Sequence, residues 1–242
     1  MKRLRDAFSF LTILPLGGGV VDGKDLGGMV AVFPFVGLVL GLLALTAAYF
    51  LRGVFPPALG AALLLAFTVA LTGAFHLDGL ADIFDALAVG RDRETLLAIM
   101  KESTVGVFGL SALALDLLIK YGVIVVLLRR EMYIPLVAAP LLGRWALVYM
   151  ACRFPPARDR GLGARVAGVT HGGVLARASL WLLLLPFLGW RYVLALVLVV
   201  TFLQGYGRFW THRAGGITGD ILGGGCEMVE ILVYLVALVG GA

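Results

Sequence analysis

The densest group of acidic residues lies in the segment from His76 to Asp85, which reads HLDGLADIFD. Asp78, Asp82 and Asp85 are spaced at i, i+4 and i+7, so a helix would place all three on one face. Carboxylates stacked in this way repel one another unless a positive charge lies between them. Hard divalent cations suit such a site, because Mg²⁺ prefers carboxylate oxygens and usually bridges to a substrate phosphate. The spacing predicts a metal-dependent site, with a solvated face of three unrelated acids as the alternative.

A second acidic set opens the last apolar run of the chain and consists of Asp220, Glu227 and Glu230. Their spacing, i, i+7 and i+10, again gives one helix face. Ionisable groups within a membrane span usually face the bundle interior and mark function. Since both acidic sets are expected at the same end of their helices, we expect them to converge on one metal site. The alternative is a capped helix start with interfacial carboxylates.

Basic residues that can hold an anionic substrate are Arg144, Lys101 and the arginines of the Gly-rich segment 153–177, which we expect to be a loop. Arginine binds phosphate through a bidentate fork of N–H groups. Arg144 is the strongest candidate, because a buried arginine needs a counter-charge; the alternative is a structural pair with an acid on a neighbouring helix. His76, beside the aspartates, is expected to orient a metal ligand or a phosphate.

The composition indicates which elements must position these residues. Of 242 residues, 61% are hydrophobic and only 14% are charged, against roughly 45–50% and about 25% in soluble domains. This excludes an ordinary soluble domain, a disordered chain and a disulfide-stapled fold. The net charge of +5 fits cytoplasmic loops and anionic headgroups better than nucleic acid. We expect an all-α, polytopic helix bundle in a lipid bilayer, formed by a single domain over residues 1–242.

Apolar runs predict about six or seven transmembrane helices. Residues 8–16 are too short to cross and are expected to be interfacial or re-entrant. Gly37 and Gly41 form a small-xxx-small pair that permits close helix packing, and such faces also allow self-association. Asp116 and Lys120, at i, i+4 within one run, are expected to neutralise each other. The candidate spans are 29–51, 59–75, 105–128, 133–152, 178–188, 192–204 and 221–239.

The distribution of Lys and Arg predicts the orientation. If the N-terminus is cytoplasmic, most basic residues fall in cytoplasmic segments, and only Arg52, Arg129, Arg130 and Arg191 lie on the opposite side. This is a strong positive-inside bias. Both acidic sets would then lie on the cytoplasmic side.

The residues alone thus favour a membrane-embedded, Mg²⁺-dependent enzyme of phosphoryl or phosphodiester transfer. A P-loop, a complete Rossmann fingerprint and a Ser-His-Asp arrangement are not recognisable in the sequence. The competing class is an ion-coupled transporter, which would place its ligands nearer the middle of the spans, around broken helices.

At these residues the sequence resembles the cobalamin synthase family of adenosylcobinamide-GDP ribazoletransferases. The similarity is most specific in the HLDGLAD and TGD-x-LG blocks. The sequence departs from the expected family pattern at Ile13, Glu102 and Thr104. The matching segments occur in family order: Phe10-Leu11-Thr12 with Pro15, residues 33–37, residues 72–85, residues 99–103, Gly106, Gly109, Arg144-Trp145, Gly161-Leu162-Gly163, residues 218–223, Glu227 and Glu230.

The resemblance implies an enzyme of the prokaryotic plasma (inner) membrane. It would join adenosylcobinamide-GDP and α-ribazole 5′-phosphate, or α-ribazole, with release of GMP in the last assembly step of cobalamin biosynthesis. A related alternative is a CDP-alcohol phosphotransferase, whose longer signature is absent here. The implied metal ligands are Asp78, Asp82, Asp85, Asp220, Glu227 and Glu230, with Asp78, Asp82, Asp85 and Glu227 as catalytic residues. Arg144, Lys101, His76 and Asp220 would bind the substrates.

Overall fold

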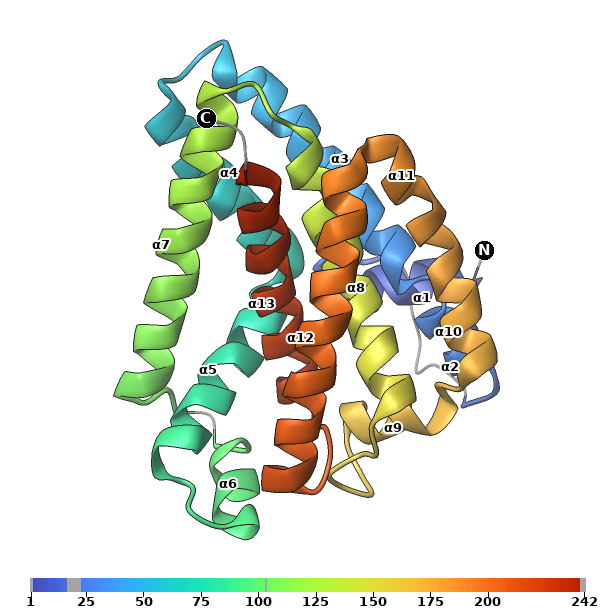
Figure 1. Ribbon diagram of the computed structural model, residues 1–242. Helices are drawn as coiled ribbons and strands as arrows, with labels where there is room; N and C mark the ends of the chain where they lie inside the picture. The colour runs from blue at the N-terminus through green and yellow to red at the C-terminus, as the bar shows by residue number, and fades with distance from the viewer. Residues whose placement is uncertain (1, 17–22, 103, 240–242) are drawn as a thin grey trace.

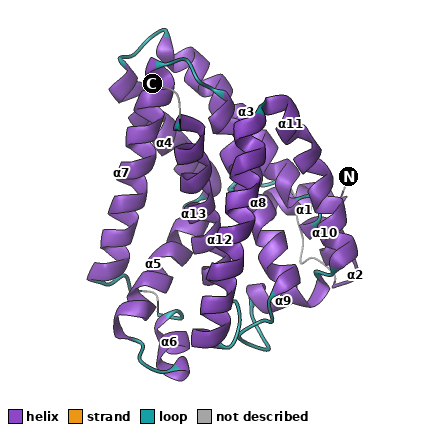
Figure 2. Cartoon of the chain, viewed as in Figure 1, coloured by secondary structure: helices purple, strands orange, loops and turns teal. Residues whose placement is uncertain are grey.

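The computed structural model describes residues 2–16, 23–102 and 104–239, and its named elements are all helices (Figures 1 and 2). Ser103, part of one motif above, lies outside these ranges. The expected all-α class is confirmed. The helices are α1 (Lys2–Leu11), α2 (Gly23–Val30), α3 (Phe33–Arg52), α4 (Pro57–Thr72), α5 (Phe75–Val89), α6 (Arg93–Ile99), α7 (Val107–Arg129), α8 (Ile134–Arg153), α9 (Leu162–Val169), α10 (Gly172–Ser179), the 3₁₀ helix η1 (Leu180–Leu184), α11 (Leu185–Leu188), α12 (Trp190–Ala214) and α13 (Gly219–Leu238).

Five helical stretches within the described residues are long and apolar enough to cross a membrane. Two further pairs, bent by 90° and 93°, raise this number to seven if each pair is one span. Each of the seven predicted runs overlaps one of these stretches or pairs, which confirms the polytopic bundle. The five are Leu26–Arg52, Val107–Arg129, Ile134–Arg153, Trp190–Ala214 and Gly219–Leu238, and the bent pairs are Pro57–Thr72 with Phe75–Val89 and Gly163–Val169 with Gly172–Leu188.

Helix α8 forms the centre of the bundle and is buried along nearly its whole length. It packs against α3 on one side and α13 on the other. The contact with α3 is close because a Cβ at Gly37 would lie 2.2 Å from the carbonyl oxygen of Pro140, and one at Gly41 would lie 2.6 Å from the Cα of Val137. The predicted role of this glycine pair in close packing is confirmed.

A sharp bend separates α4 from α5 and sets the direction of the aspartate-bearing helix. Gly73 and Ala74 both have positive φ, 60° and 57°, and the two helix axes differ by 90°. Left-handed backbone is unfavourable for alanine, so other contacts must hold it. One of these is the hydrogen bond that the Ile13 amide donates to the Leu71 carbonyl, at 2.9 Å. The bend turns α5 onto α13, one of its main packing partners.

The expectation of a loop over residues 153–177 was wrong for its second half. Helices α9 and α10 form there, because Val166 and Val174 are buried and supply apolar faces that pack against α8. His171 begins α10, since its Nδ1 accepts a hydrogen bond from the Gly173 amide at 3.2 Å. High glycine content obscured this helical pattern in the sequence.

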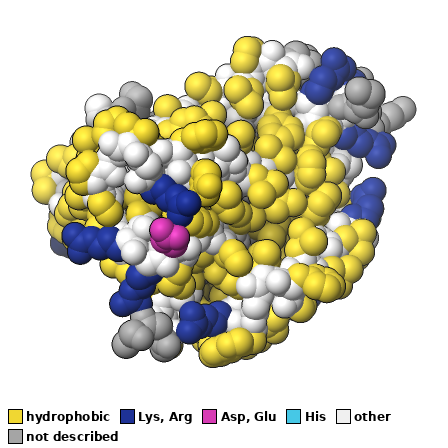
Figure 3. All heavy atoms as spheres, turned by 90° about the horizontal axis from the view of Figure 1, so that it is seen from above, with side chains coloured by type: hydrophobic (Ala, Val, Ile, Leu, Met, Phe, Trp, Pro, Cys, Tyr) yellow, Lys and Arg dark blue, Asp and Glu magenta, His cyan; other side chains and the backbone are white. Residues whose placement is uncertain are grey.

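The surface agrees with a lipid environment. Seen from above in Figure 3, hydrophobic side chains cover much of the molecule, and Lys and Arg side chains gather around an acidic one on one side and along the opposite edge. On α7, Phe108, Leu110 and Leu118 are exposed. An exposed apolar surface of this extent is unusual in soluble monomers and is expected where a protein meets lipid.

Candidate functional site

The aspartates of α5 approach the start of α13 at a close backbone contact. A Cβ at Gly79 would lie 2.8 Å from the carbonyl oxygen of Asp220, so only glycine allows this approach. On α13, Gly224 likewise packs against α5, where a Cβ would lie 2.4 Å from Ile83 Cδ1. Gly79 of the HLDGLAD motif and Gly224, which directly follows the TGD-x-LG motif, therefore bring the two acidic helices together.

Three carboxylates, which we call the outer cluster, result from this contact: Asp78, Asp82 and Asp220. Asp78 is exposed, while Asp82 and Asp220 are half-buried. The charged neighbours of Asp82 are all acidic and include the other two members of the cluster. In the described part of the chain, no basic side chain forms an ion pair with any of the three. Asp220 accepts one hydrogen bond, from the hydroxyl of Thr218 at 3.2 Å.

Asp85, expected to be a metal ligand, instead caps another helix. Its two carboxylate oxygens accept hydrogen bonds from the amides of Gly106 and Gly109, at 2.7 and 2.8 Å, at the start of α7. A Cβ at Gly106 would lie 2.5 Å from an Asp85 oxygen, and one at Gly109 would lie 2.4 Å away. The matching glycines and Asp85 thus form one capping unit, which satisfies amides that have no partner within the helix.

We expect Asp85→Ala to lower the free energy of unfolding by about 1–2 kcal/mol, because the amides at the start of α7 lose their acceptor. Asp78→Ala, which removes an exposed carboxylate that makes no hydrogen bond across the described residues, is the matched comparison and should leave the melting temperature unchanged or slightly raised. Thermal unfolding of both variants in lipid measures the difference. An Asp85→Ala protein with the melting temperature of the unsubstituted chain would contradict the capping role.

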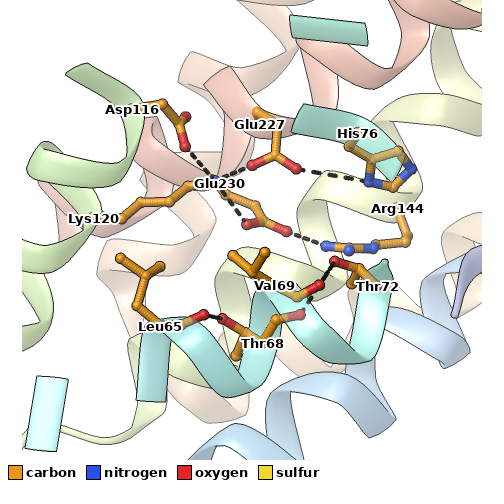
Figure 4. A network of polar contacts seen from close by, with 10 residues as sticks. All are labelled: Leu65, Thr68, Val69, Thr72, His76, Asp116, Lys120, Arg144, Glu227 and Glu230. Carbon is orange, nitrogen blue, oxygen red and sulfur yellow. Dashed lines mark hydrogen bonds and ion pairs between the residues drawn. The ribbon is translucent and has the colours of Figure 1, made fainter. Parts of the chain in front are cut away.

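Glu227 and Glu230 lie in a separate buried network, which we call the inner network (Figure 4). Lys120 Nζ contacts carboxylate oxygens of Asp116 at 3.1 Å and Glu230 at 3.4 Å, and it donates a hydrogen bond to Glu227. Arg144 donates a hydrogen bond to Glu230. The expected pairing of Asp116 with Lys120 is confirmed, and both belong to a larger set of three carboxylates and two cations.

This arrangement differs from the expected single site. Arg144 is 3% exposed and is paired with Glu230, which matches the structural alternative rather than a substrate contact. His76 is also buried, with its Nδ1 3.9 Å from Glu227 Oε1. Lys101 is exposed. Apart from Asp85 and Lys101, the structure therefore divides the predicted site residues between an open outer cluster and an inner network whose charges are largely paired within the chain.

Helix α4 closes one side of the inner network without joining it. Its threonine hydroxyls donate hydrogen bonds within α4 itself. The Thr68 hydroxyl donates to the Leu65 carbonyl at 2.9 Å, and the Thr72 hydroxyl donates to the Thr68 carbonyl at 3.2 Å. A small residue beside Arg144 makes room for the ion pair, because a Cβ at Gly143 would lie 3.1 Å from Glu230 Cγ. The inner network thus lines a hollow inside the bundle, whose opposite wall is α4, and its charges are paired with one another, as buried charges require.

Comparison with known proteins identifies the family. The family model for cobalamin-5-phosphate synthase matches residues 3–238. The chain belongs to this family. A protein from Stutzerimonas stutzeri named adenosylcobinamide-GDP ribazoletransferase is 41% identical, over 99% of this chain and 100% of that protein. Proteins with the same name from Desulforamulus reducens and Roseiflexus are 37% and 38% identical, over 98% and 94% of this chain and 96% and 85% of theirs. No solved structure matches.

Whether the chain can bind Mg²⁺ depends on which of the acids predicted as metal ligands have carboxylate oxygens that no other group of the chain engages. In the described residues, no group of three Asp, Glu, His or Cys side chains is arranged closely enough to hold a metal ion. The oxygens of Asp85 accept amide hydrogen bonds, and those of Glu227 and Glu230 contact cations. The outer cluster retains hard oxygen donors that form no ion pair within the described residues, with Arg158 as a charged neighbour of Asp220. That chemistry fits Mg²⁺, which commonly takes one or two carboxylates and completes its shell with water and substrate phosphate.

Proposed function

We propose that this chain is an adenosylcobinamide-GDP ribazoletransferase. It joins adenosylcobinamide-GDP to α-ribazole 5′-phosphate, or to α-ribazole, and releases GMP. The single observation that carries this proposal is the match to one family over nearly the whole chain, with relatives of that name covered almost end to end. The pair of acidic helices is the part of the fold best suited to the reaction.

The reaction is a displacement at phosphorus. A ribose hydroxyl of the nucleoside attacks the phosphorus on the cobinamide side of the diphosphate, the bond from that phosphorus to the oxygen of GMP breaks, and the hydroxyl proton is transferred to a base. Positioning and charge stabilisation supply most of the catalysis in such displacements. We assign the reacting diphosphate to the outer cluster, because its carboxylates are accessible and have no ion-pair partner in the described chain.

We assign to Asp78, Asp82 and Asp220 the one or two carboxylate ligands that Mg²⁺ would take from the protein, with water and substrate phosphate completing its shell. When bound, the metal would neutralise charge on the diphosphate and on the departing GMP. Asp220 is held by Thr218, whose hydroxyl also accepts a hydrogen bond from the Ile221 amide at 3.2 Å and so begins α13. The helix start therefore fixes the direction of one carboxylate relative to α5.

The inner network has a positioning role in this proposal. It joins α7, α8 and α13 through ion pairs, and His76 of α5 lies against it. Both acidic helices of the outer cluster thus continue into the same charged core. We place the outer cluster on the cytoplasmic side of the plasma (inner) membrane, in accord with the positive-inside bias.

The proposal is tested with purified protein in lipid, supplied with adenosylcobinamide-GDP and α-ribazole 5′-phosphate, with Mg²⁺ or with EDTA. We expect GMP and the joined corrinoid product, detected by mass, only in the presence of Mg²⁺. Folded protein that forms no product but accumulates a solute in sealed vesicles under an ion gradient would instead support a transporter. Product formation unchanged by EDTA would leave the activity standing and remove the Mg²⁺ proposal.

A further inference from the structure

A groove rimmed by basic side chains adjoins the outer cluster. One part is lined by Lys101, Arg158, Arg160 and Gly161, together with one acidic residue, Asp159. It continues through both arginines into a second hollow that reaches Thr218 and Asp220. We call this continuous feature the basic groove. It runs between the α6–α7 connection, the segment after α8 and the start of α13. Its arginines therefore lie close to Asp220 of the outer cluster.

The chain segment that carries the two arginines is held firmly in place. The Ala157 amide donates to the Ile217 carbonyl and the Ile217 amide to the Pro155 carbonyl, both at 2.9 Å. Arg93 donates to the carbonyl of Ala157 at 3.0 Å, and Arg158 donates to that of Leu97. A loop fixed by four such bonds presents its side chains in a defined direction, which favours a binding function.

The cations of the basic groove differ from those of the inner network. Lys120 and Arg144 are buried and paired with acids, whereas Lys101 and Arg160 are exposed. Across the described chain, no hydrogen bond or ion pair engages either of these two side chains. Their charges are available to a ligand. Arg158 is a charged neighbour of Asp220, so the basic groove begins where the outer cluster ends.

We propose that the basic groove binds the phosphate oxygens of a nucleotide substrate through Lys101, Arg158 and Arg160. This inference rests on the proposed function, because a reaction at a diphosphate must bring phosphate oxygens to the outer cluster. Carboxylates alone would repel that diphosphate, and adjacent arginines and lysine offset the repulsion while fixing its orientation. The phosphate belongs either to adenosylcobinamide-GDP or to α-ribazole 5′-phosphate.

The double variant Lys101→Gln/Arg160→Gln tests this assignment, since both side chains are exposed and their loss should not disturb folding. We expect the KM for the substrate whose phosphate occupies the groove to rise about tenfold or more, the effect of losing charge-assisted hydrogen bonds. If the KM rises only for adenosylcobinamide-GDP, and if GDP also binds more weakly at equilibrium in the presence of EDTA, the groove is assigned to the diphosphate. A rise for α-ribazole 5′-phosphate, but not for α-ribazole, assigns it to the other nucleotide.

The matched control is Arg208→Gln, which removes an exposed positive charge from α12, outside the groove. It should leave both KM values and the affinity for GDP unchanged. If the double variant has the same KM values and GDP affinity as this control, the basic groove inference is overturned. Activity of the unsubstituted protein in the same assay separates that result from failure of the proposed function.

Discussion

Replacing Asp82 with Asn lowers kcat by at least about a hundredfold, the loss typical of removing one group that stabilises transition-state charge. Asn keeps the size of the side chain but removes the negative charge that Mg²⁺ requires. The charged neighbours of Asp82 are all acidic and include the other two carboxylates of the outer cluster. The substitution therefore relieves repulsion, and the melting temperature should stay constant or rise slightly. Measuring kcat across a Mg²⁺ titration, together with thermal unfolding, separates the two effects.

Glu94→Gln provides the control for Asp82→Asn. Glu94 is an exposed acid in the first turn of α6, outside the outer cluster, so the same change from acid to amide should leave kcat and the Mg²⁺ dependence unaltered. If Asp82→Asn retained full Mg²⁺-dependent activity, the assignment of the outer cluster would be incorrect even though the chain belongs to this family.

Replacing Lys120 with Met lowers the free energy of unfolding by about 3–5 kcal/mol, because it leaves buried carboxylates without their cation. Lys120 is 5% exposed and contacts three acids on its own helix and on α13. Removing it strands Asp116 and Glu227 in the bundle interior, where an unpaired charge is costly. The expected result is a large fall in melting temperature or in the yield of folded protein, measured in detergent and in lipid.

A second variant makes this prediction specific to charge. In Lys120→Met/Glu227→Gln, one of the stranded carboxylates is neutralised, so stability should partly recover relative to Lys120→Met alone. Coupled residues show such non-additive effects in double-mutant cycles. Equal destabilisation of the single and double variants would indicate that Lys120 contributes by packing rather than by its ion pairs.

Local patterns in the sequence predicted much of the fold. The apolar runs predicted the spans, since a helix needs about 20 apolar residues to cross a bilayer and its backbone groups must be satisfied within the segment. The pairing of Asp116 with Lys120 followed from i, i+4 spacing, and close helix packing at Gly37 followed from small-residue spacing, although the partner helix did not. These predictions were confirmed because they depend on neighbouring residues within one helix or on the size of the side chains along one face of a helix.

The interpretation of the acids was less accurate, because spacing shows which residues share a face but not what the face meets. Asp85 shares its face with Asp82, yet its oxygens accept hydrogen bonds from the amides of Gly106 and Gly109, which lie 21 and 24 residues further along the chain. Glu227 shares a face with Asp220, yet it meets Lys120, 107 residues away. In the same way, the apolar residues that make α9 and α10 helical have their partners on other helices, which local composition does not reveal.

By itself, the sequence determined that this protein is a bundle of membrane-type helices and that its acids lie on two helix faces, because composition and period are local properties. Its motifs also pointed to the family that the comparisons show. Only the tertiary structure decided which acids remain open to a ligand. The bend at Gly73-Ala74 and the close contact of Gly79 with Asp220 bring the outer cluster together. Long-range ion pairs withdraw Glu227 and Glu230 into the core, because buried charges must find partners wherever the folded chain provides them.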